Sequence, residues 1–554
     1  MLTDAESYPY DLGDHSFEIT TSSRQAQRWF DLGLAWTYGF HHEEAVRCFE
    51  RALEHDAECV MALWGIAYAL GPNYNKPWEA FDEDELRQAT RRCHETAAKA
   101  QSLGDRVGAA ERALVDALVH RYPSVEPVED CAGWNPPYAA AMAEVYSDHQ
   151  DHPDVAALFA EALMNLTPWE LWDLAAGTPA DGAKTERARE VLERALATDG
   201  GDRHPGLLHL YIHLMEMSPF PELALPAADA LRDLVPDSGH LQHMPTHIDV
   251  LCGHYERVVS SNEAAIVADR KVLAADGALN FYSLYRCHDY HFKLYGAMFL
   301  GQLGPALEAA DEMIATLPEE LLRVESPPMA DWLEGFVPMK LHVLIRFGRW
   351  QDILDVALPK DRELFCTTTA MTHYARGVAF AATGRTEEAR GERELFRAAA
   401  ERVPDSRYVF NNTCRDILAV ASAMLDGEIE YRLGHFDDAF EHLRRSIALD
   451  DGLPYDEPWG WMQPTRHAYG ALLLEQGHVE EAAAVYRADL GFDDALARAY
   501  QHPDNVWSLH GYHECLERLG QTNEARIIRQ RLDLAVARAD VPIEASCACR
   551  LTKA

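Results

Sequence analysis

Hydrophobic and polar positions alternate with a helical period near the start of the chain, over residues 28–58. Trp29 and Trp36 recur on one face of a first predicted helix, and Ala45 and Phe49 recur on one face of a second. Steps of three and four residues keep apolar side chains on one side of a helix, and the polar residues between them face water. The pattern predicts two amphipathic helices joined by a short turn.

The same spacing defines a tetratricopeptide (TPR) unit, W-x2-L-G-x2-Y…A-x3-F, with Trp36 in the place of the usual tyrosine. Further second helices are predicted after turn glycines in "CGHYERVVSSNEAAI", "LGQLGPALEAADEMI", "LGHFDDAFEHLRRSIALD" and "LGQTNEARIIRQRL". We therefore predict an all-α superhelical TPR solenoid of about nine to ten helix pairs with loop insertions. The predicted parts of this single solenoid (1–554) are an N-terminal extension (1–24), helical repeats (25–540) with histidine-rich units (205–304), and a C-terminal tail (541–554).

Histidines recur at one repeat length in the central units. His243 follows His209, and His247 follows His213, by about one TPR length of 34 residues. Each residue of these two pairs falls on the stripe of a first helix that lines the concave groove of a TPR array, and neighbouring first helices pack about 8–10 Å apart. His240 shares that stripe. We therefore expect the two pairs to face the groove side by side.

The next unit adds two histidines. With Gly304 taken as its turn glycine, His291 falls on the groove stripe and His288 lies one helical turn earlier. Neutral imidazoles gathered in one place are typical of a metal site, because each donates a lone pair to the ion. The predicted metal ligands are His209, His213, His240, His243, His247, His288 and His291, and the alternative is a groove that recognises an acidic or aromatic peptide.

Imidazole ligands suit copper, iron and zinc, and seven histidines are enough for one or two ions. Cys547 and Cys549 form a C-x-C pair in the tail and are further candidate ligands, since thiolates favour Cu(I) or Zn. Glu216 would permit a histidine–carboxylate iron centre or a bridging carboxylate. Histidine richness and the thiol pair together favour copper over iron, with zinc as a further alternative.

A metal cluster surrounded by tryptophan- and proline-rich insertions predicts an enzyme. We expect a metal-dependent oxidoreductase that acts on a small molecule with O2, with Glu216 and Glu161 as candidate catalytic residues. The chain has no glycine-rich phosphate loop, G-x-S-x-G elbow or H-E-x-x-H helix. The alternatives are an adaptor that binds a peptide in the TPR groove and a metal-binding protein without catalysis.

The net charge of the chain limits the classes of partner that we expect. The formal net charge is −40, which repels phosphate backbones and anionic lipids, so neither nucleic acid nor membrane is an expected partner. A protein partner remains compatible with the repeats. Eleven cysteines without disulfide-like spacing, no apolar run of about 18 residues and no secretory signal predict a cytoplasmic protein.

The chain resembles a widespread group of uncharacterised TPR-domain proteins of bacteria and fungi. The matching stretches include "GLAWTYGFHHEEAVRCFERAL", "WGIAYALGPNYN", "HLYIHLMEMSP", "GHLQHMPTHI", "CHDYHF", "YDEPWGWMQPTRH" and the terminal "SCACR". The resemblance spans essentially the whole chain and implies the repeat fold with a histidine-rich groove. Cys287 stands where similar proteins are expected to have proline, which adds a thiol beside His288.

Overall fold

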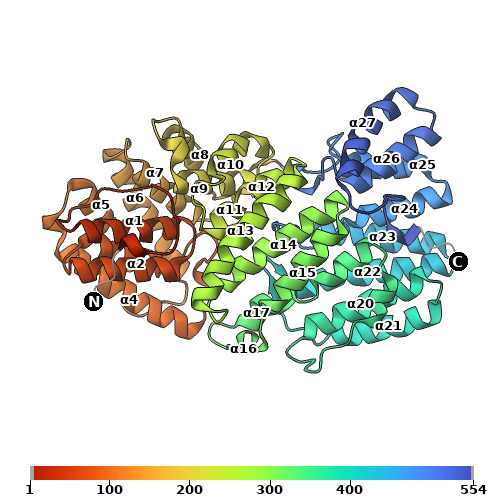
Figure 1. Cartoon of the computed structure of the whole chain (residues 1–554), viewed down its shortest axis with the longest axis horizontal. Helices are drawn as coiled ribbons and strands as arrows, with labels where there is room; N and C mark the ends of the chain where they lie inside the picture. The colour runs from red at the N-terminus through yellow and green to blue at the C-terminus, as the bar shows by residue number, and fades with distance from the viewer. Residues whose placement is uncertain (1–4, 551–554) are drawn as a thin grey trace. The chain divides into compact units, whose positions relative to one another are not determined.

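The computed structural model describes residues 5–550. The chain divides into two compact units. Unit 1 comprises residues 1–248 and 264–272, and unit 2 comprises residues 249–263 and 273–554. Almost all of the regular structure in both units is helical, and helices that follow each other in the chain lie side by side as antiparallel pairs, as α1 with α2 and α22 with α23 (Figure 1). The predicted all-α TPR solenoid fold is confirmed, whereas the single-solenoid boundaries stay a prediction.

The N-terminal half of the chain consists of short to medium helices and one two-stranded hairpin. Its elements are α1 (Arg24–Tyr38), α2 (His42–His55), α3 (Val60–Ala69), α4 (Glu83–Ser102), α5 (Ala109–Leu118), α6 (Asn135–Asp148), α7 (Pro153–Met164), β1 (Trp172–Asp173), β2 (Thr178–Pro179), α8 (Thr185–Leu196), α9 (Pro205–Glu216), α10 (Leu225–Leu231), α11 (Gly239–His243) and α12 (Pro245–Leu251). The strands pair antiparallel, with Trp172 opposite Pro179.

The C-terminal half continues with helix pairs and a second short hairpin. Its elements are α13 (Tyr255–Asp276), α14 (Ser283–Leu300), α15 (Leu303–Ala315), α16 (Glu319–Leu322), α17 (Met329–Leu333), α18 (Met339–Arg346), α19 (Trp350–Asp355), α20 (Cys366–Ala382), α21 (Thr386–Ala400), β3 (Tyr408–Val409), β4 (Asn412–Thr413), α22 (Cys414–Arg432), α23 (Phe436–Asp451), α24 (Thr465–Gln476), α25 (Val479–Asp489), α26 (Val506–Arg518) and α27 (Thr522–Arg538). Strands β3 and β4 pair antiparallel, with Tyr408 opposite Thr413.

The small residues of the repeat pattern let helices approach one another. A Cβ added at Gly33 of α1 or at Gly65 of α3 would lie 2.6 Å from the ring of Phe49 in α2, so only glycine allows that ring to pack between the helices. The turn glycines that precede second helices adopt the left-handed conformation, where glycine has no steric cost. They are Gly253, Gly301, Gly348, Gly384, Gly434, Gly477 and Gly520.

One turn glycine differs from the prediction. The backbone of Gly301 has φ +75°, and α15 begins two residues later, so Gly304 lies inside the second helix and not at the turn. The repeat position of His291 is therefore shifted by three residues. His288 and His291 occupy the positions that His240 and His243 occupy before their own turn at Gly253.

Candidate metal centre

Two helical segments of unit 1 bring five histidines together. Helix α9 carries His209 and His213 one turn apart, and the segment formed by α11 and α12 carries His240, His243 and His247. The segment divides before Pro245, which has no N–H to donate to the carbonyl one turn earlier. All five side chains are at most 1% exposed. The structure thus brings these five histidines together inside the unit, where their side chains are buried.

Three of the five rings are held at their outer nitrogen. Nδ1 of His209 donates to the carbonyl oxygen of Tyr38 at 2.6 Å. Glu216 accepts from Nδ1 of His213 at 3.0 Å with one carboxylate oxygen and from Nδ1 of His247 at 2.6 Å with the other. Because a carbonyl or a carboxylate only accepts, each neutral ring carries its proton on Nδ1 and its lone pair on Nε2. An acceptor on the far nitrogen is the usual second-shell arrangement of a metal-binding histidine.

The lone pairs converge on one place. Nε2 of His209 and Nε2 of His213 are buried and have no hydrogen-bond partner among residues 5–550. Ligand atoms of His209, His213 and His240 all lie within 4.8 Å of one another. Buried polar atoms are normally hydrogen-bonded, and three imidazole nitrogens at this separation could serve as ligands of one transition-metal ion. We refer to His209, His213, His240, His243, His247 and Glu216 as the histidine cluster.

His243 and His247 form the second part of the histidine cluster. Their Nε2 atoms are 2.8 Å apart. Since His247 has its proton on Nδ1, where Glu216 accepts it, the Nε2 proton between the rings belongs to His243. Oγ1 of Thr246 lies 3.4 Å from Nδ1 of His243. An ion bound by both rings at Nε2 would have to displace this shared proton.

Aromatic rings close the histidine cluster. The ring of Phe40 lies 4.5 Å from that of His209, and the rings of Tyr74 and Trp169 lie 4.9 Å and 5.7 Å from that of His213. Phe40 and Trp169 both have positive φ, at 57° and 62°, which is rare for a bulky residue. Residue spacing gives no signal for Phe40 and Trp169, because their places depend on turns with positive φ.

Burial controls the charge of the histidine cluster. It lowers the pKa of His209 and of His213 well below the usual value, and neighbouring imidazoles lower it further. Burial also raises the pKa of Glu216, and His247 opposes that shift. Burial therefore favours the neutral form of His209 and of His213, which is the protonation state that binds metal ions.

Glu161 of α7 is linked to the histidine cluster through Tyr74. Its carboxylate is buried, accepts from the hydroxyl of Tyr68 and from the backbone of Tyr74, and lies near the fully buried guanidinium of Arg121. Burial raises its pKa, and the charge of Arg121 opposes the shift. Asn165 bonds to the same carboxylate. These contacts position the turn that carries Tyr74, and the predicted catalytic roles of Glu161 and Glu216 are not tested by them.

A second histidine cluster of unit 1 was missed in the sequence. Oδ1 of Asp154 accepts from the hydroxyl of Tyr38 at 2.8 Å and lies 3.0 Å from Nε2 of His15 and 3.1 Å from Nε2 of His204. Nδ1 of His204 accepts from the backbone N–H of Leu207 at 3.2 Å and caps α9. We call His15, Asp154 and His204 the cap cluster. No sequence spacing indicates it, because its members come from three distant segments.

The remaining predicted ligands belong to unit 2. His288 and His291 are buried in α14, where Phe410 packs against both rings at 4.7 Å and 6.4 Å. Nε2 of His291 lies 2.8 Å from Sδ of Met462. Burial lowers the pKa of His291 to about 3, and neighbouring His342 lowers it further. The predicted convergence of all seven histidines stays a prediction.

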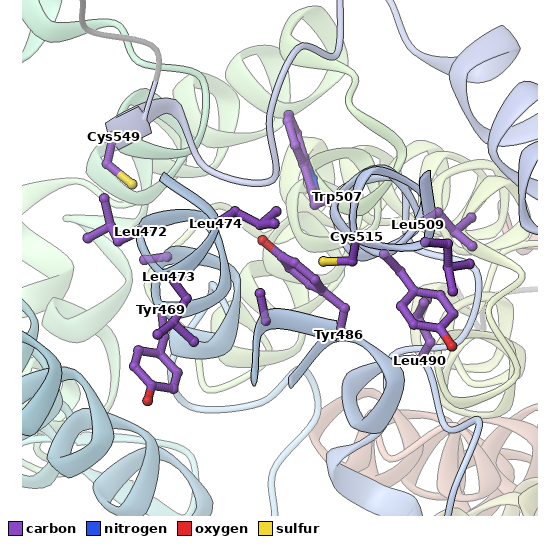
Figure 2. Close-up of a cluster of buried hydrophobic side chains, with 14 of the residues drawn as sticks. Tyr469, Leu472, Leu473, Leu474, Tyr486, Leu490, Trp507, Leu509, Cys515 and Cys549 are labelled. Atoms are coloured by element: carbon purple, nitrogen blue, oxygen red, sulfur yellow. The ribbon is translucent and has the colours of Figure 1, made fainter. Parts of the chain in front are cut away.

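The C-x-C tail packs into unit 2. Cys547 and Cys549 are joined as a disulfide, and Cys549 belongs to a hydrophobic core with residues of α24, α25 and α26, among them Leu472 and Tyr486 (Figure 2). Arg346 donates to the carbonyl of Ser546. The tail is thus part of the packing of unit 2, and its sulfurs are not thiolates here. A metal-binding role for this pair stays a prediction.

No family model and no curated protein matches the chain. Solved structures with similar folds include Ypp1, with a TM-score of 0.41 and 8% identity over 95% of this chain and 82% of that one. Yeast Tom70 has a TM-score of 0.30 and 10% identity over 93% and 98% of the two chains. The human IFIT1 dimer with m7Gppp-AAAA has a TM-score of 0.29 and 11% identity over 94% and 92%. The likeness concerns the helical-repeat fold, and membership of the bacterial and fungal group is not shown.

The prediction of a metal-dependent oxidoreductase is wrong. The solved structures that resemble the chain are TPR-type scaffold or binding proteins, among them the Cut9–Hcn1 hetero-tetramer of the APC/C. The small-molecule substrate and O2 were partners of that enzyme and have no support, whereas a protein partner fits the fold. Among residues 5–550, no helix is long and apolar enough to cross a membrane. The cytoplasmic location stays a prediction.

Proposed function

We propose that the chain is a non-catalytic TPR-type binding protein that holds a transition-metal ion in the histidine cluster of unit 1. One observation supports this proposal above the others. The Nε2 lone pairs of His209 and His213 are buried without a hydrogen-bond partner among the described residues, while their Nδ1 atoms are held by Tyr38 and Glu216.

Without an ion, these lone pairs would be costly. A buried polar atom that loses water and gains no partner costs about 1–3 kcal/mol. Protonation does not relieve the cost, because burial and neighbouring rings disfavour a charge on either imidazole. A metal ion satisfies all the inward nitrogens at once and keeps the rings neutral.

The donor set favours copper. Both oxygens of Glu216 are engaged by imidazole N–H groups, so the inward ligands are imidazoles alone. An iron centre of the histidine–carboxylate type would need a free carboxylate, whereas copper and zinc accept an all-imidazole set. Copper also binds nitrogen sites more tightly than the other divalent ions of its row. We place copper first, zinc second and iron third.

The test is metal analysis of the tag-free full chain after equilibration with copper, zinc or ferrous iron. We expect stoichiometric copper in the wild type and in His373→Gln, and at least one equivalent less in His213→Gln. His373 is a matched control, because it is a buried histidine that bonds through Nδ1 to Glu392 and has no place in the cluster. Equal metal content in His213→Gln and the wild type, or no bound metal in either, would overturn the proposal.

The helical-repeat fold and a net charge of −40 support a second candidate function, a scaffold for a basic protein segment. Such a partner is attracted through exposed carboxylates, so its affinity should fall steeply with ionic strength. The test is a titration with polylysine and polyglutamate peptides at low and high salt. Binding of polylysine alone, weakened by salt, is expected, and equal or absent binding of both would contradict it.

A further inference from the structure

We propose that unit 2 contains a separate site for monovalent copper, formed by the imidazoles of His291 and His342 and the thioether of Met462. The site lies entirely within unit 2, and it does not depend on the metal proposed for unit 1. It also uses a different kind of ligand, a neutral sulfur.

The contact between His291 and Met462 is the first observation. Both residues are completely buried, and Nε2 of His291 lies 2.8 Å from Sδ of Met462. A thioether is a weak hydrogen-bond acceptor, so it is a poor sole partner for a buried ring nitrogen. Nδ1 of His291 has no hydrogen-bond partner at all among residues 5–550. The surroundings thus leave this imidazole without the polar partners that buried groups normally have.

His342 completes the set from α18. Its side chain is 2% exposed, and its Nδ1 is a second buried nitrogen with no partner in the described part of the chain. The two residues that flank Met462 in the chain both contact His342. The ring of Trp461 lies 4.9 Å from the His342 ring, and Nε2 of Gln463 donates to the His342 carbonyl at 2.7 Å. Helix α18, which carries His342, packs against α14, the helix that carries His291.

Apolar residues enclose these donors. The ring of Phe336, which is fully buried, meets the ring of His291 edge-on at 5.2 Å. Trp461 is 2% exposed and covers His342. An ion held here would lie in a water-poor environment with neutral ligands, which favours a singly charged ion over a divalent one.

The chemistry of the donors selects the metal. Imidazole binds several transition metals, but a thioether sulfur is a soft ligand that favours Cu(I). Zinc sites in proteins use imidazole, thiolate and carboxylate ligands and do not use thioethers. Two imidazoles and a thioether therefore suit Cu(I), in contrast to the all-imidazole histidine cluster of unit 1.

The experiment uses the full chain carrying Cys547→Ser and Cys549→Ser, so that the tail supplies no sulfur ligand. Cu(I), kept reduced with ascorbate, is titrated against a chromophoric Cu(I) chelator, and the bound copper is examined by X-ray absorption. We expect a sulfur scatterer in the starting protein and its loss in Met462→Leu. The affinity of Met462→Leu for the last copper equivalent should be weaker by about tenfold or more. Met424→Leu is the matched control, because Sδ of Met424 accepts from Ser446 and contacts a hydroxyl instead of an imidazole.

A second measurement requires no substitution at the site. In protein labelled with ¹³C at the methionine methyl groups, Ag(I), a diamagnetic substitute for Cu(I), should shift the Met462 signal and leave the Met424 signal in place. Both experiments are repeated with His213→Gln, which removes the proposed unit 1 site only. Retention of the sulfur scatterer in Met462→Leu, or an unshifted Met462 signal, would overturn the unit 2 site whatever happens in unit 1.

Discussion

Two groups of buried histidines in unit 1 differ in where the carboxylate lies. In the cap cluster Asp154 is central, and it accepts from the Tyr38 hydroxyl and lies within hydrogen-bond distance of two imidazoles. In the histidine cluster Glu216 is peripheral, and it accepts from the outer nitrogens of His213 and His247. A central carboxylate accepts hydrogen bonds from the rings around it. A peripheral carboxylate accepts from their outer nitrogens, so the lone pairs of their inner nitrogens point toward the centre of the cluster.

The comparison shows that a count of nearby histidines does not identify a metal site. Both clusters place three possible ligand atoms within 4.8 Å. In the cap cluster, both nitrogens of His204 are used, one by Asp154 and one by the backbone of Leu207. In the histidine cluster, one nitrogen of His209 and one of His213 remain without a partner among residues 5–550. The cap cluster is therefore structural, and the histidine cluster has capacity for a ligand.

Tyr38 connects the two clusters at the end of α1. Its hydroxyl donates to Asp154, and its carbonyl accepts from Nδ1 of His209. The cap cluster also fixes the start of α9, the helix that carries His209 and His213. The cap cluster thus stabilises the helices beside the histidine cluster, although none of its members belongs to that cluster.

The largest expected change in free energy is a loss of folding stability when the carboxylate at the centre of the cap cluster is removed. Asp154→Ala leaves His15, His204 and the Tyr38 hydroxyl without their acceptor, and breaking such a buried charged network costs about 3–5 kcal/mol. Urea unfolding followed by circular dichroism measures this loss. Copper content per folded molecule should be unchanged. A loss of stability under about 1 kcal/mol would mean that the cap cluster is not a structural centre.

The second largest expected effect is a loss of metal affinity when the peripheral carboxylate of Glu216 is replaced. Glu216→Gln keeps the shape of the side chain but weakens the hold on His213 and His247, and loss of such a second-shell acceptor lowers metal affinity by about 10–100-fold. Competition with a copper chelator measures the change. Glu428→Gln is the control, because this buried carboxylate bonds to Arg432 and to no histidine of the cluster. Equal effects of the two substitutions would show that Glu216 has no special role.

The repeat pattern predicted the fold and most of the histidine cluster. The 34-residue offset alone placed the His209 and His213 pair against the His243 and His247 pair, because equivalent positions of neighbouring repeats face one another. It did not predict that the site is closed. Closure comes from Phe40 and Trp169, which reach the cluster only through turns with positive φ, and such conformations carry no spacing signal.

The cap cluster was beyond the reach of the sequence for a different reason. His15 comes from the N-terminal extension and bonds to Asp154, 139 residues later. No periodicity relates an extended segment to a helix so far along the chain. The sequence also did not predict that Glu216 accepts hydrogen bonds from two imidazoles. Glu216 lies three residues after His213 on the same helical face, and this spacing is equally compatible with a metal ligand and with a second-shell acceptor.

The smallest effect concerns a buried histidine that belongs to neither cluster. Burial lowers the pKa of His41 to about 3, and the charges of Arg47 and His42 contribute to this shift. The pKa of a histidine in an unfolded chain is about 6.5. Because the folded pKa is the lower one, the stability from neutral His41 is complete above the unfolded pKa and is lost as pH falls below it. Between pH 7 and pH 6 this loss amounts to about 0.7 kcal/mol. Urea unfolding of the metal-free protein should show a correspondingly shallower pH dependence in His41→Gln. An unchanged dependence would mean that His41 is protonated in the folded chain, and burial alone would then be too weak to keep the rings of the histidine cluster neutral.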